Sequence, residues 1–316
     1  MTVDHCRQII QGDALAVLRA MESDSVDCCI TSPPYWGLRD YGVDGQIGLE
    51  KTPEEFVAKL VDVLREVRRV LKPDGTCWVN LGDSYAATTK GSSGKGDKQI
   101  TNAGTIHQNR HWSIPVGLKP KDLCGIPWRV AFALQADGWW LRQDIIWSKP
   151  NPMPESVQDR CTKAHEYLFL LTKSAKYFWD AGAMQEPANR PEGAGNKNHK
   201  GLTAYNGGDE KMRTKVGLTE IGARETRNKR SVWTLATMAT PEAHFATYPI
   251  ELPETCLLAG SRPGGLILDP FNGAGTTGLA ALKNGRRYIG IELNPAYIEI
   301  THQRFQKYMP LLAVNE

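Results

Sequence analysis

An α/β fold with a mostly parallel sheet and helices on both faces is the fold class that this sequence predicts. Strand-like and helix-like patterns alternate along the chain, which is typical of parallel sheets whose strands are joined by helices. Val26–Ile30 is a short apolar run that indicates a buried strand, and Leu266–Asp269 is another, placed directly before a glycine-rich turn. Two stretches break the alternation, 87–120 and 186–230, and neither has enough large apolar residues to build a core of its own.

The clearest predicted helix covers residues 52–71. Thr52 can cap its N-terminus, with Glu55 at capping-box spacing and Pro53 in the first turn. Six apolar residues recur at helical spacing and predict a single buried stripe: Phe56, Leu60, Val63, Leu64, Val67 and Leu71. This amphipathic pattern indicates a helix that covers one face of the sheet.

The remaining elements are predicted from shorter patterns. Residues 73–75, Pro-Asp-Gly, predict a turn that leads into a strand over 76–81. Further strands are expected over 140–147, 166–171 and 288–292, and further helices over 127–136, 252–259, 277–283 and 295–308. The order of these elements fits one α/β domain with insertions.

Length and composition exclude several classes of protein. The chain has 316 residues, enough for one large domain, and a formal net charge of +3, which by itself does not indicate nucleic-acid binding. No apolar run approaches the ~20 residues that span a bilayer, and Met1–His5 lacks the pattern of a signal peptide. The seven cysteines contain no Cys-x-x-Cys pair, which favours free thiols in a reducing cytoplasm over disulfides or a metal site.

A glycine-rich turn follows the strand 266–269. Gly273, Gly275 and Gly278 match the dinucleotide fingerprint Gly-x-Gly-x-x-Gly, in which glycines let the backbone approach a ligand. Glu292, at the end of the next predicted strand, is placed to accept hydrogen bonds from ribose hydroxyls. These features predict a cofactor that contains adenosine, and a glycine turn without a ligand is the alternative.

The position of this turn in the chain separates the candidate cofactors. A dinucleotide domain needs two mononucleotide-binding halves after its first strand, and only about forty residues follow Gly275. The rest of the sheet must come from sequence that precedes the turn. A half-sized adenosine site fits S-adenosylmethionine better than NAD, and Asp269 and Phe271 before the glycines point the same way.

The tetrapeptide Ser32-Pro33-Pro34-Tyr35 follows the buried strand 26–30, so it is expected at the sheet edge where ligands of α/β proteins bind. Methylation of an exocyclic amine needs two acceptors on the amino hydrogens, which free the nitrogen lone pair for attack on a methyl group. Ser32 Oγ and the Pro33 carbonyl can supply them, because Pro34 restricts the backbone direction of Pro33. Tyr35 offers a ring on which a flipped base can stack. Such a tetrapeptide also occurs in proline-rich loops without a special function.

With both motifs present, the chain resembles the amino-methylating DNA methyltransferases of the β group, in which the catalytic tetrapeptide precedes the cofactor loop. The resemblance covers nearly all of the ordered chain. It includes residues 12–15, where Asp13 is expected to reach the cofactor's adenine, the block 147–154 with Asp159-Arg160 and His165-Glu166, and residues 244–249 beside the cofactor's methionine end. His165-Glu166 is interpreted equally well as a structural pair or as part of the site.

The resemblance implies a circularly permuted, Rossmann-like S-adenosylmethionine-dependent methyltransferase fold with inserted DNA-binding loops. The implied cofactor-binding residues are Asp13, Thr31, Tyr248, Pro249, Asp269, Phe271, Asn272, Gly273, Gly275, Thr276, Thr277, Glu292, Leu293 and Asn294, and the implied catalytic residues are Ser32, Pro33, Pro34 and Tyr35, with no metal. In the family, a serine that opens the tetrapeptide usually goes with cytosine N4, and aspartate or asparagine with adenine N6. Ser32 therefore favours cytosine N4, with adenine N6 as the alternative.

The basic residues of the chain gather in its second irregular stretch. Residues 190–230 hold ten Lys and Arg against five acids, although the whole chain carries only +3. We expect these residues to bind the DNA backbone: Lys197, Lys200, Lys211, Arg213, Lys215, Arg224, Arg227, Lys229 and Arg230. Residues 186–234 are thus the expected target-recognition insertion in a catalytic domain made of 1–185 and 235–316. The stretch 87–120 is a second expected DNA-facing loop, and two solvated loops are the alternative.

Double-stranded DNA is the expected partner of a protein located on DNA in the cytoplasm of a bacterium, an archaeon or a virus of these. Whether a cognate restriction endonuclease exists, and whether the protein is a monomer or a homodimer, stays open. Two other functions remain: methylation of an amide or amine in RNA or protein, and DNA binding without catalysis. The chain has no Pro-Cys dipeptide of the kind that C5-cytosine enzymes use for covalent attack.

Overall fold

The structure is a computed structural model that describes residues 6–38, 40–86, 114, 117–188, 225–237 and 247–312. The chain divides into two compact units. The first unit comprises Met1–Asp180 together with Ser231–Glu316, and the second comprises Ala181–Arg230. The predicted insertion 186–234 overlaps the second unit, and its role in target recognition stays a prediction.

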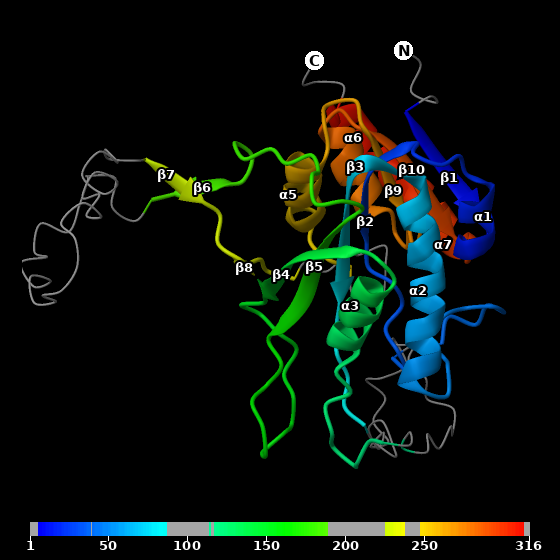
Figure 1. Ribbon diagram of the computed structural model, residues 1–316, viewed down its shortest axis with the longest axis vertical. Helices are drawn as coiled ribbons and strands as arrows, with labels where there is room; N and C mark the ends of the chain where they lie inside the picture. The colour runs from blue at the N-terminus through cyan, green and yellow to red at the C-terminus, as the bar shows by residue number, and fades with distance from the viewer. Residues whose placement is uncertain are drawn as a thin grey trace, which may run out of the picture. The chain divides into compact units, whose positions relative to one another are not determined.

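An eight-stranded sheet forms the centre of the first unit, with the strand order β1-β10-β9-β2-β3-β5-β4-β8. Its strands are β1 (Arg7–Gln11), β2 (Val26–Thr31), β3 (Leu71–Leu81), β4 (Trp140–Ser148), β5 (His165–Thr172), β8 (Val232–Thr234), β9 (Leu266–Asp269) and β10 (Arg287–Glu292). Neighbouring strands are parallel except where β5 pairs with β3 and β4. Figure 1 shows these strands side by side. The predicted α/β class with a mostly parallel sheet is confirmed.

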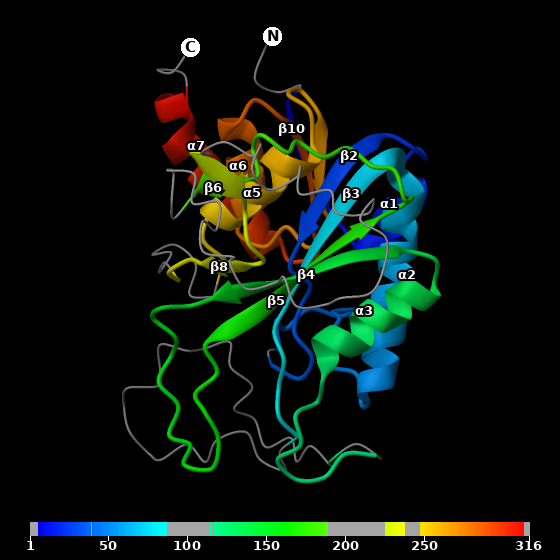
Figure 2. The same cartoon turned by 60° about the vertical axis from the view of Figure 1, so that its left-hand side comes forward.

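Helices cover both faces of this sheet, as predicted (Figure 2). One face carries α1 (Ala14–Ala20), α2 (Pro53–Val70) and α3 (Ile126–Ala136), with α2 in contact with both of the others. The other face carries α5 (Glu251–Gly260), α6 (Thr276–Lys283) and α7 (Pro295–Leu312), with α6 in the middle. The order of strands and helices matches a permuted Rossmann-like fold, because β9 and its glycine turn lie in the middle of the sheet although they come late in the chain.

The cap of α2 forms nearly as the sequence predicts. Thr52 Oγ1 accepts a hydrogen bond from the Glu55 N–H at 3.1 Å. The Glu55 carboxylate accepts from the Lys51 N–H at 3.0 Å, one residue earlier than in a standard capping box. The predicted apolar stripe is buried in full, and Val70 adds to it. The amphipathic pattern therefore positioned this helix correctly.

The predicted turn at 73–75 is wrong in one respect, because these residues lie within β3. Val26 pairs with Leu71, but Cys28 pairs with Thr76, so the extra residues of β3 form an irregularity beside β2. The buried Asp27 carboxylate lies at this irregularity, where it pairs with Lys72 Nζ at 2.8 Å and accepts from the Leu266 N–H at 2.8 Å. The sequence analysis also missed β1, α1 and β8, which are too short for a clear pattern.

The second unit contains a two-stranded antiparallel sheet of β6 (Gln185–Pro187) and β7 (Thr226–Asn228). Two of the predicted DNA-binding residues, Arg227 and Arg230, contact Glu186 Oε1 through their Nε atoms at 2.8 and 2.7 Å. Lys229, a third predicted DNA-binding residue, directly precedes Arg230 in the sequence. The other predicted DNA-binding residues, from Lys197 to Arg224, lie outside the described residues, as does 87–120 apart from 114 and 117–120.

All seven cysteines carry free thiols, and five of them are buried. Across the described ranges, the structure contains no cluster of three or more side chains that could hold a metal ion. No helix in that part of the chain is long and apolar enough to cross a membrane.

Candidate active site

A pocket opens at one edge of the eight-stranded sheet. Its walls come from the segments that follow β1, β2, β9 and β10, which are parallel strands that end at the same edge. Trp147 at the end of β4 and Lys149 directly after it also line the pocket. Glu166 lies at the start of β5, and because β5 is antiparallel its start meets the same edge. The sheet thus brings together segments that are separated by up to about 280 residues in the chain.

The glycine turn after β9 has the backbone that its sequence predicts. Gly273 and Gly275 have φ of +50° and +73°, in the left-handed region where side chains are strained. A Cβ on Gly275 would lie 2.6 Å from Thr301 Cγ2, and one on Gly278 would lie 2.5 Å from Phe305 Cζ. The turn can therefore pack directly against α7 only because these positions are glycines.

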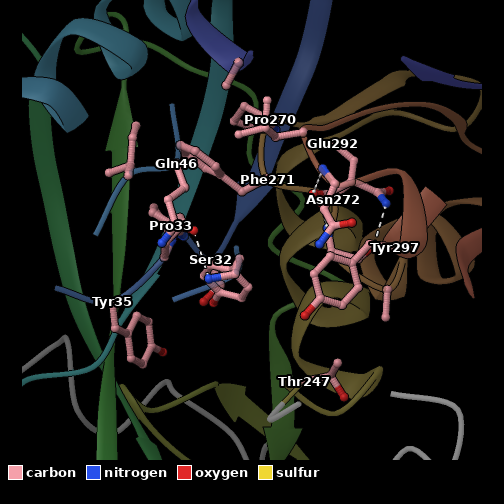
Figure 3. A pocket seen from close by; sticks show the side chains of 18 of the residues that line it. Ser32, Pro33, Tyr35, Gln46, Thr247, Pro270, Phe271, Asn272, Glu292 and Tyr297 are labelled. Carbon is pink, nitrogen blue, oxygen red and sulfur yellow. Dashed lines mark hydrogen bonds between the residues drawn. The ribbon is translucent and has the colours of Figure 1, made fainter. Parts of the chain in front are cut away.

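Glu292 connects this turn to the end of β10. Its two carboxylate oxygens accept hydrogen bonds from the Gly273 N–H and the Asn294 N–H, each at 2.8 Å (Figure 3). Burial raises the pKa of this carboxyl, while the two backbone hydrogen bonds act in the opposite direction. The side chain lines the pocket and retains lone pairs that can accept from a ligand.

Asp269 lies beneath the turn and does not line the pocket. It is buried, and its carboxylate accepts hydrogen bonds from Thr31 Oγ1 at 2.7 Å, from Thr277 Oγ1 at 2.8 Å and from the Phe271 N–H at 3.1 Å. Burial raises the pKa of Asp269 to about 6. The hydroxyl of Tyr248 contacts both Asp269 and Thr277. This carboxylate stabilises the turn from behind.

The tetrapeptide after β2 forms the other end of the pocket. Figure 3 shows Ser32, Pro33 and Tyr35 on one side of the Phe271 ring, and Asn272, Glu292 and Tyr297 on its other side. The Tyr35 ring packs tightly on Gly82, where a Cβ would lie 2.4 Å from its Cε2. One pocket therefore holds both motifs that the sequence analysis singled out.

Three pocket residues beside the tetrapeptide were absent from the predicted site. Glu166 Oε2 accepts hydrogen bonds from Tyr35 Oη at 2.5 Å and from Asn80 Nδ2 at 2.8 Å. Lys149 Nζ forms an ion pair with Glu166 Oε1 and lies 4.4 Å from the centroid of the Trp147 ring. The resemblance of 147–154 and of His165-Glu166 was the one signal in the sequence for Lys149 and Glu166, and no motif pointed to Asn80. His165 itself packs on Tyr167.

Most of the predicted site residues line this pocket: Asp13, Ser32, Pro33, Pro34, Tyr35, Tyr248, Phe271, Asn272, Gly273, Thr276, Glu292, Leu293 and Asn294. Five predicted cofactor-binding residues do not line it: Thr31, Pro249, Asp269, Gly275 and Thr277. Asp13 caps α1 by accepting from the Ala16 N–H at 2.9 Å. The individual roles of all these residues stay predictions.

Comparison with known proteins identifies the family. A family model described as DNA methylase, of the N6 and N4 type, matches residues 26–303. The chain belongs to this DNA methylase family. It is 47% identical to the Type II methyltransferase M.Cfr9I of Citrobacter freundii over 298 residues, which cover 94% of this chain and 87% of that protein. It is 46% identical to the Type II methyltransferase M.SmaI of Serratia marcescens, with 94% and 90% covered. The predicted family is confirmed.

Solved structures share the fold of this methylase. A PvuII DNA methyltransferase described as cytosine-N4-specific superposes with a TM-score of 0.62 at 19% identity, covering 95% of this chain and 86% of that one. A protein from Thermus thermophilus, described as a putative DNA modification methylase complexed with S-adenosyl-L-methionine, superposes with a TM-score of 0.60 at 24% identity, covering 96% and 95%. The predicted methyltransferase fold is thereby confirmed.

Proposed function

We propose that this methylase transfers a methyl group from S-adenosyl-L-methionine to N4 of a cytosine that is flipped out of double-stranded DNA. The observation that carries the proposal is the shared pocket, in which the Ser32 hydroxyl lies at one end and the glycine turn with Glu292 at the other. DNA methylation is the activity of the family. The choice of cytosine and the flipping of the base are our inference.

The cofactor end of the pocket fits S-adenosyl-L-methionine. A Cβ on Gly273 would meet only the Phe271 carbonyl oxygen, at 3.9 Å, so this glycine leaves open space on the pocket side. The Glu292 carboxylate can accept from ribose hydroxyls, and the Phe271 ring can stack on a flat or apolar group. Bound there, the cofactor supplies an activated methyl group on sulfur.

The other end fits an exocyclic amine. Ser32 Oγ and the Pro33 carbonyl oxygen can accept hydrogen bonds from its two hydrogens. These two hydrogen bonds favour a tetrahedral nitrogen, whose lone pair is less delocalised into the ring and can attack the methyl group. Tyr35 is held by its hydrogen bond to Glu166, so its ring is oriented before a base arrives. A serine at this position favours cytosine over adenine by family resemblance, and the structural neighbour described as cytosine-N4-specific supports the same choice.

Binding of the DNA backbone is assigned to the basic residues of 190–230. Arg227 and Arg230 both pair with the carboxylate of Glu186, at 2.8 and 2.7 Å, so these two basic side chains lie close together. Phosphate contacts of this kind position DNA and carry no sequence information. Residues 87–120 are proposed as a second DNA-facing loop of an enzyme that works on DNA in the cytoplasm.

The test incubates the protein with methyl-labelled S-adenosyl-L-methionine and a mixture of unmethylated DNA, RNA and protein, followed by digestion to nucleosides and amino acids. We expect the label in N4-methylcytosine of the DNA. Label in N6-methyladenine would overturn the choice of base but retain DNA amino methylation. Label in RNA or protein alone, with the cofactor bound, would overturn the proposed substrate.

A further inference from the structure

The connection between β4 and β5, residues 149–164, begins and ends at the pocket. Lys149 lines the pocket directly after β4, and Glu166 lines it near the start of β5. In Figures 1 and 2 this connection extends as a long green loop beyond the ends of both strands. DNA that places a base in the pocket is therefore expected to lie next to this loop.

Hydrogen bonds hold the first half of the loop at the rim of the pocket. Asn151 Nδ2 donates to the Thr237 carbonyl at 3.1 Å, and the Thr237 N–H donates to Asn151 Oδ1 at 2.9 Å. Thr237 itself lines the pocket. Met153 follows Asn151 by two residues, so their Cα atoms are at most about 7 Å apart. Met153 is thus held beside the opening of the pocket.

The second half of the loop is fixed by its own side chains. The Glu155 carboxylate pairs with Arg160 Nη1 at 2.7 Å and accepts a hydrogen bond from the Lys163 N–H at 3.0 Å. The Lys149 N–H donates to the Ala164 carbonyl at 2.8 Å, which closes the loop at its base. Residues 150–154, the tip, lie between these anchored points.

Prolines at 150, 152 and 154 stiffen the tip. Each proline fixes its own φ and confines the residue before it to extended conformations. The alternating pattern therefore restricts every residue from Lys149 to Pro154. Because its backbone is restricted in advance, Met153 loses little conformational entropy when it binds a partner.

Met153 is the apolar side chain of this tip. It is 83% exposed, while the next most exposed large apolar side chain among the described residues, that of Val232, is 57% exposed. Single exposed apolar side chains are common on protein surfaces, so the position of Met153 gives its exposure a meaning. Residues 150–154 carry no charge. A neutral, stiff tip with an unbranched apolar side chain is suited to enter the space between two bases.

A base that leaves the double helix opens a gap between its two neighbours, and the lost stacking costs free energy. We propose that Met153 fills this gap and so stabilises the DNA with the target base flipped into the pocket. The inference rests on the base flipping proposed above. Met153 acts on the opening of the helix and has no role in the transfer of the methyl group.

Oxidation of methionine by hydrogen peroxide, followed by mass spectrometry of peptides, measures the access of solvent to Met153. The probe is a short duplex that contains the site methylated in the labelling test, with S-adenosyl-L-homocysteine present. We expect this duplex to slow the oxidation of Met153 by about tenfold or more, because the bases would cover the sulfur. Met21, packed on the core at the end of α1, is the internal control and should oxidise at one rate throughout.

Two outcomes of this oxidation experiment would overturn the proposal. In the first, Met153 oxidises equally fast with and without the duplex, so DNA does not cover it. In the second, Met153 is already protected without DNA when the protein concentration is raised, which would assign it to a contact between two copies of the chain.

Substitutions test whether Met153 fills a gap or only touches DNA. Met153→Gln keeps the length of the side chain and removes its apolar character, so kcat should fall roughly ten- to a hundredfold. The fluorescence of 2-aminopurine at the target position, which rises when a base unstacks, should fall with it. Met153→Leu should restore both to within about threefold of the wild type, because leucine can also act as a wedge. The matched control is Phe132→Ala, which alters an exposed apolar side chain outside the pocket.

A duplex with a mismatch at the target base provides the decisive comparison. A mismatched base costs less to flip, so Met153→Gln should lose less than about threefold in kcat there. Equal losses on the paired and the mismatched duplex would overturn the role as a wedge, as would wild-type turnover of Met153→Gln on the paired duplex.

Failure of the proposed function gives a different result from failure of this inference. If the proposed function fails, the wild type itself puts no label into DNA or produces no rise in 2-aminopurine fluorescence, and this inference fails with it. If the inference alone fails, the wild type shows both signals and the Met153 variants share them. Met153 lies at the surface, so we expect all of its variants to fold.

Discussion

Thr31 donates a hydrogen bond of 2.7 Å to the buried carboxylate of Asp269, although 238 residues separate the two. Thr31 ends β2 directly before the tetrapeptide, and Asp269 ends β9 directly before the glycine turn. The two strands pair in parallel in the middle of the sheet. This single bond therefore joins the two segments that form opposite ends of the pocket.

Thr31→Val tests the strength of this link, because valine keeps the shape of threonine and removes the donor. We expect the free energy of unfolding to fall by about 1–3 kcal/mol, since a buried carboxylate loses a partner. Urea unfolding measures it. The control is Thr255→Val in α5, where the hydroxyl bonds to the carbonyl of Glu251 at the surface. Equal losses in the two variants would show that the link contributes nothing.

The raised pKa of Asp269 predicts a dependence of stability on pH. Burial raises this pKa from 3.8 to about 6, so the folded protein binds the proton more tightly than the unfolded chain. The contribution of Asp269 to the free energy of unfolding should therefore fall as pH rises from about 4 to about 6, by about 3 kcal/mol, and stay constant above. The free energy of unfolding is measured from pH 4 to 7 for the wild type and for Asp269→Asn. Over this range that of the wild type should fall by this amount relative to that of Asp269→Asn. Parallel pH profiles would contradict the prediction.

Gly275→Ala and Gly264→Ala form a matched pair at the same backbone angle. Both glycines have φ of +73°, so both variants should lose about 1–2 kcal/mol of stability from backbone strain. A Cβ meets nothing within 4 Å at Gly264, but lies 2.6 Å from Thr301 Cγ2 at Gly275. Gly275→Ala should therefore cost about 1–3 kcal/mol more in urea unfolding. Equal costs would mean that α7 moves away freely.

Phe271→Ala tests the cofactor end of the pocket. The ring lies between the two ends of the pocket, and its removal should weaken S-adenosyl-L-methionine binding by about ten- to a hundredfold, the effect of losing one stacking aromatic ring (about 1–3 kcal/mol). Calorimetric titration measures the Kd. Phe132→Ala is the control, because Phe132 is 56% exposed on α3 and does not line the pocket. An unchanged Kd for Phe271→Ala would remove this ring from the cofactor site.

The local motifs were readable from the chain because their geometry depends on neighbouring residues. The cap at Thr52, the left-handed glycines at 273 and 275, and the buried strands before both motifs follow from spacing and side-chain type alone. The irregularity in β3 could not be predicted from the sequence, because it concerns how β3 pairs with β2, where Asp27 and Lys72 meet across the two strands. Asp269 was expected to bind the cofactor, but the sheet places it behind the glycine turn, where it does not line the pocket.

The sequence by itself determined the family, the α/β class, the order of the two motifs and the residues that carry them, because each is encoded in a short run of the chain. Only the tertiary structure decided that Asn80, Lys149 and Glu166 gather behind Tyr35. These residues lie in or directly after three different strands, and the reversal of β5 alone brings Glu166 to the pocket edge. Strand order and direction are set by packing of the whole sheet, so no local pattern records which side chains will meet there.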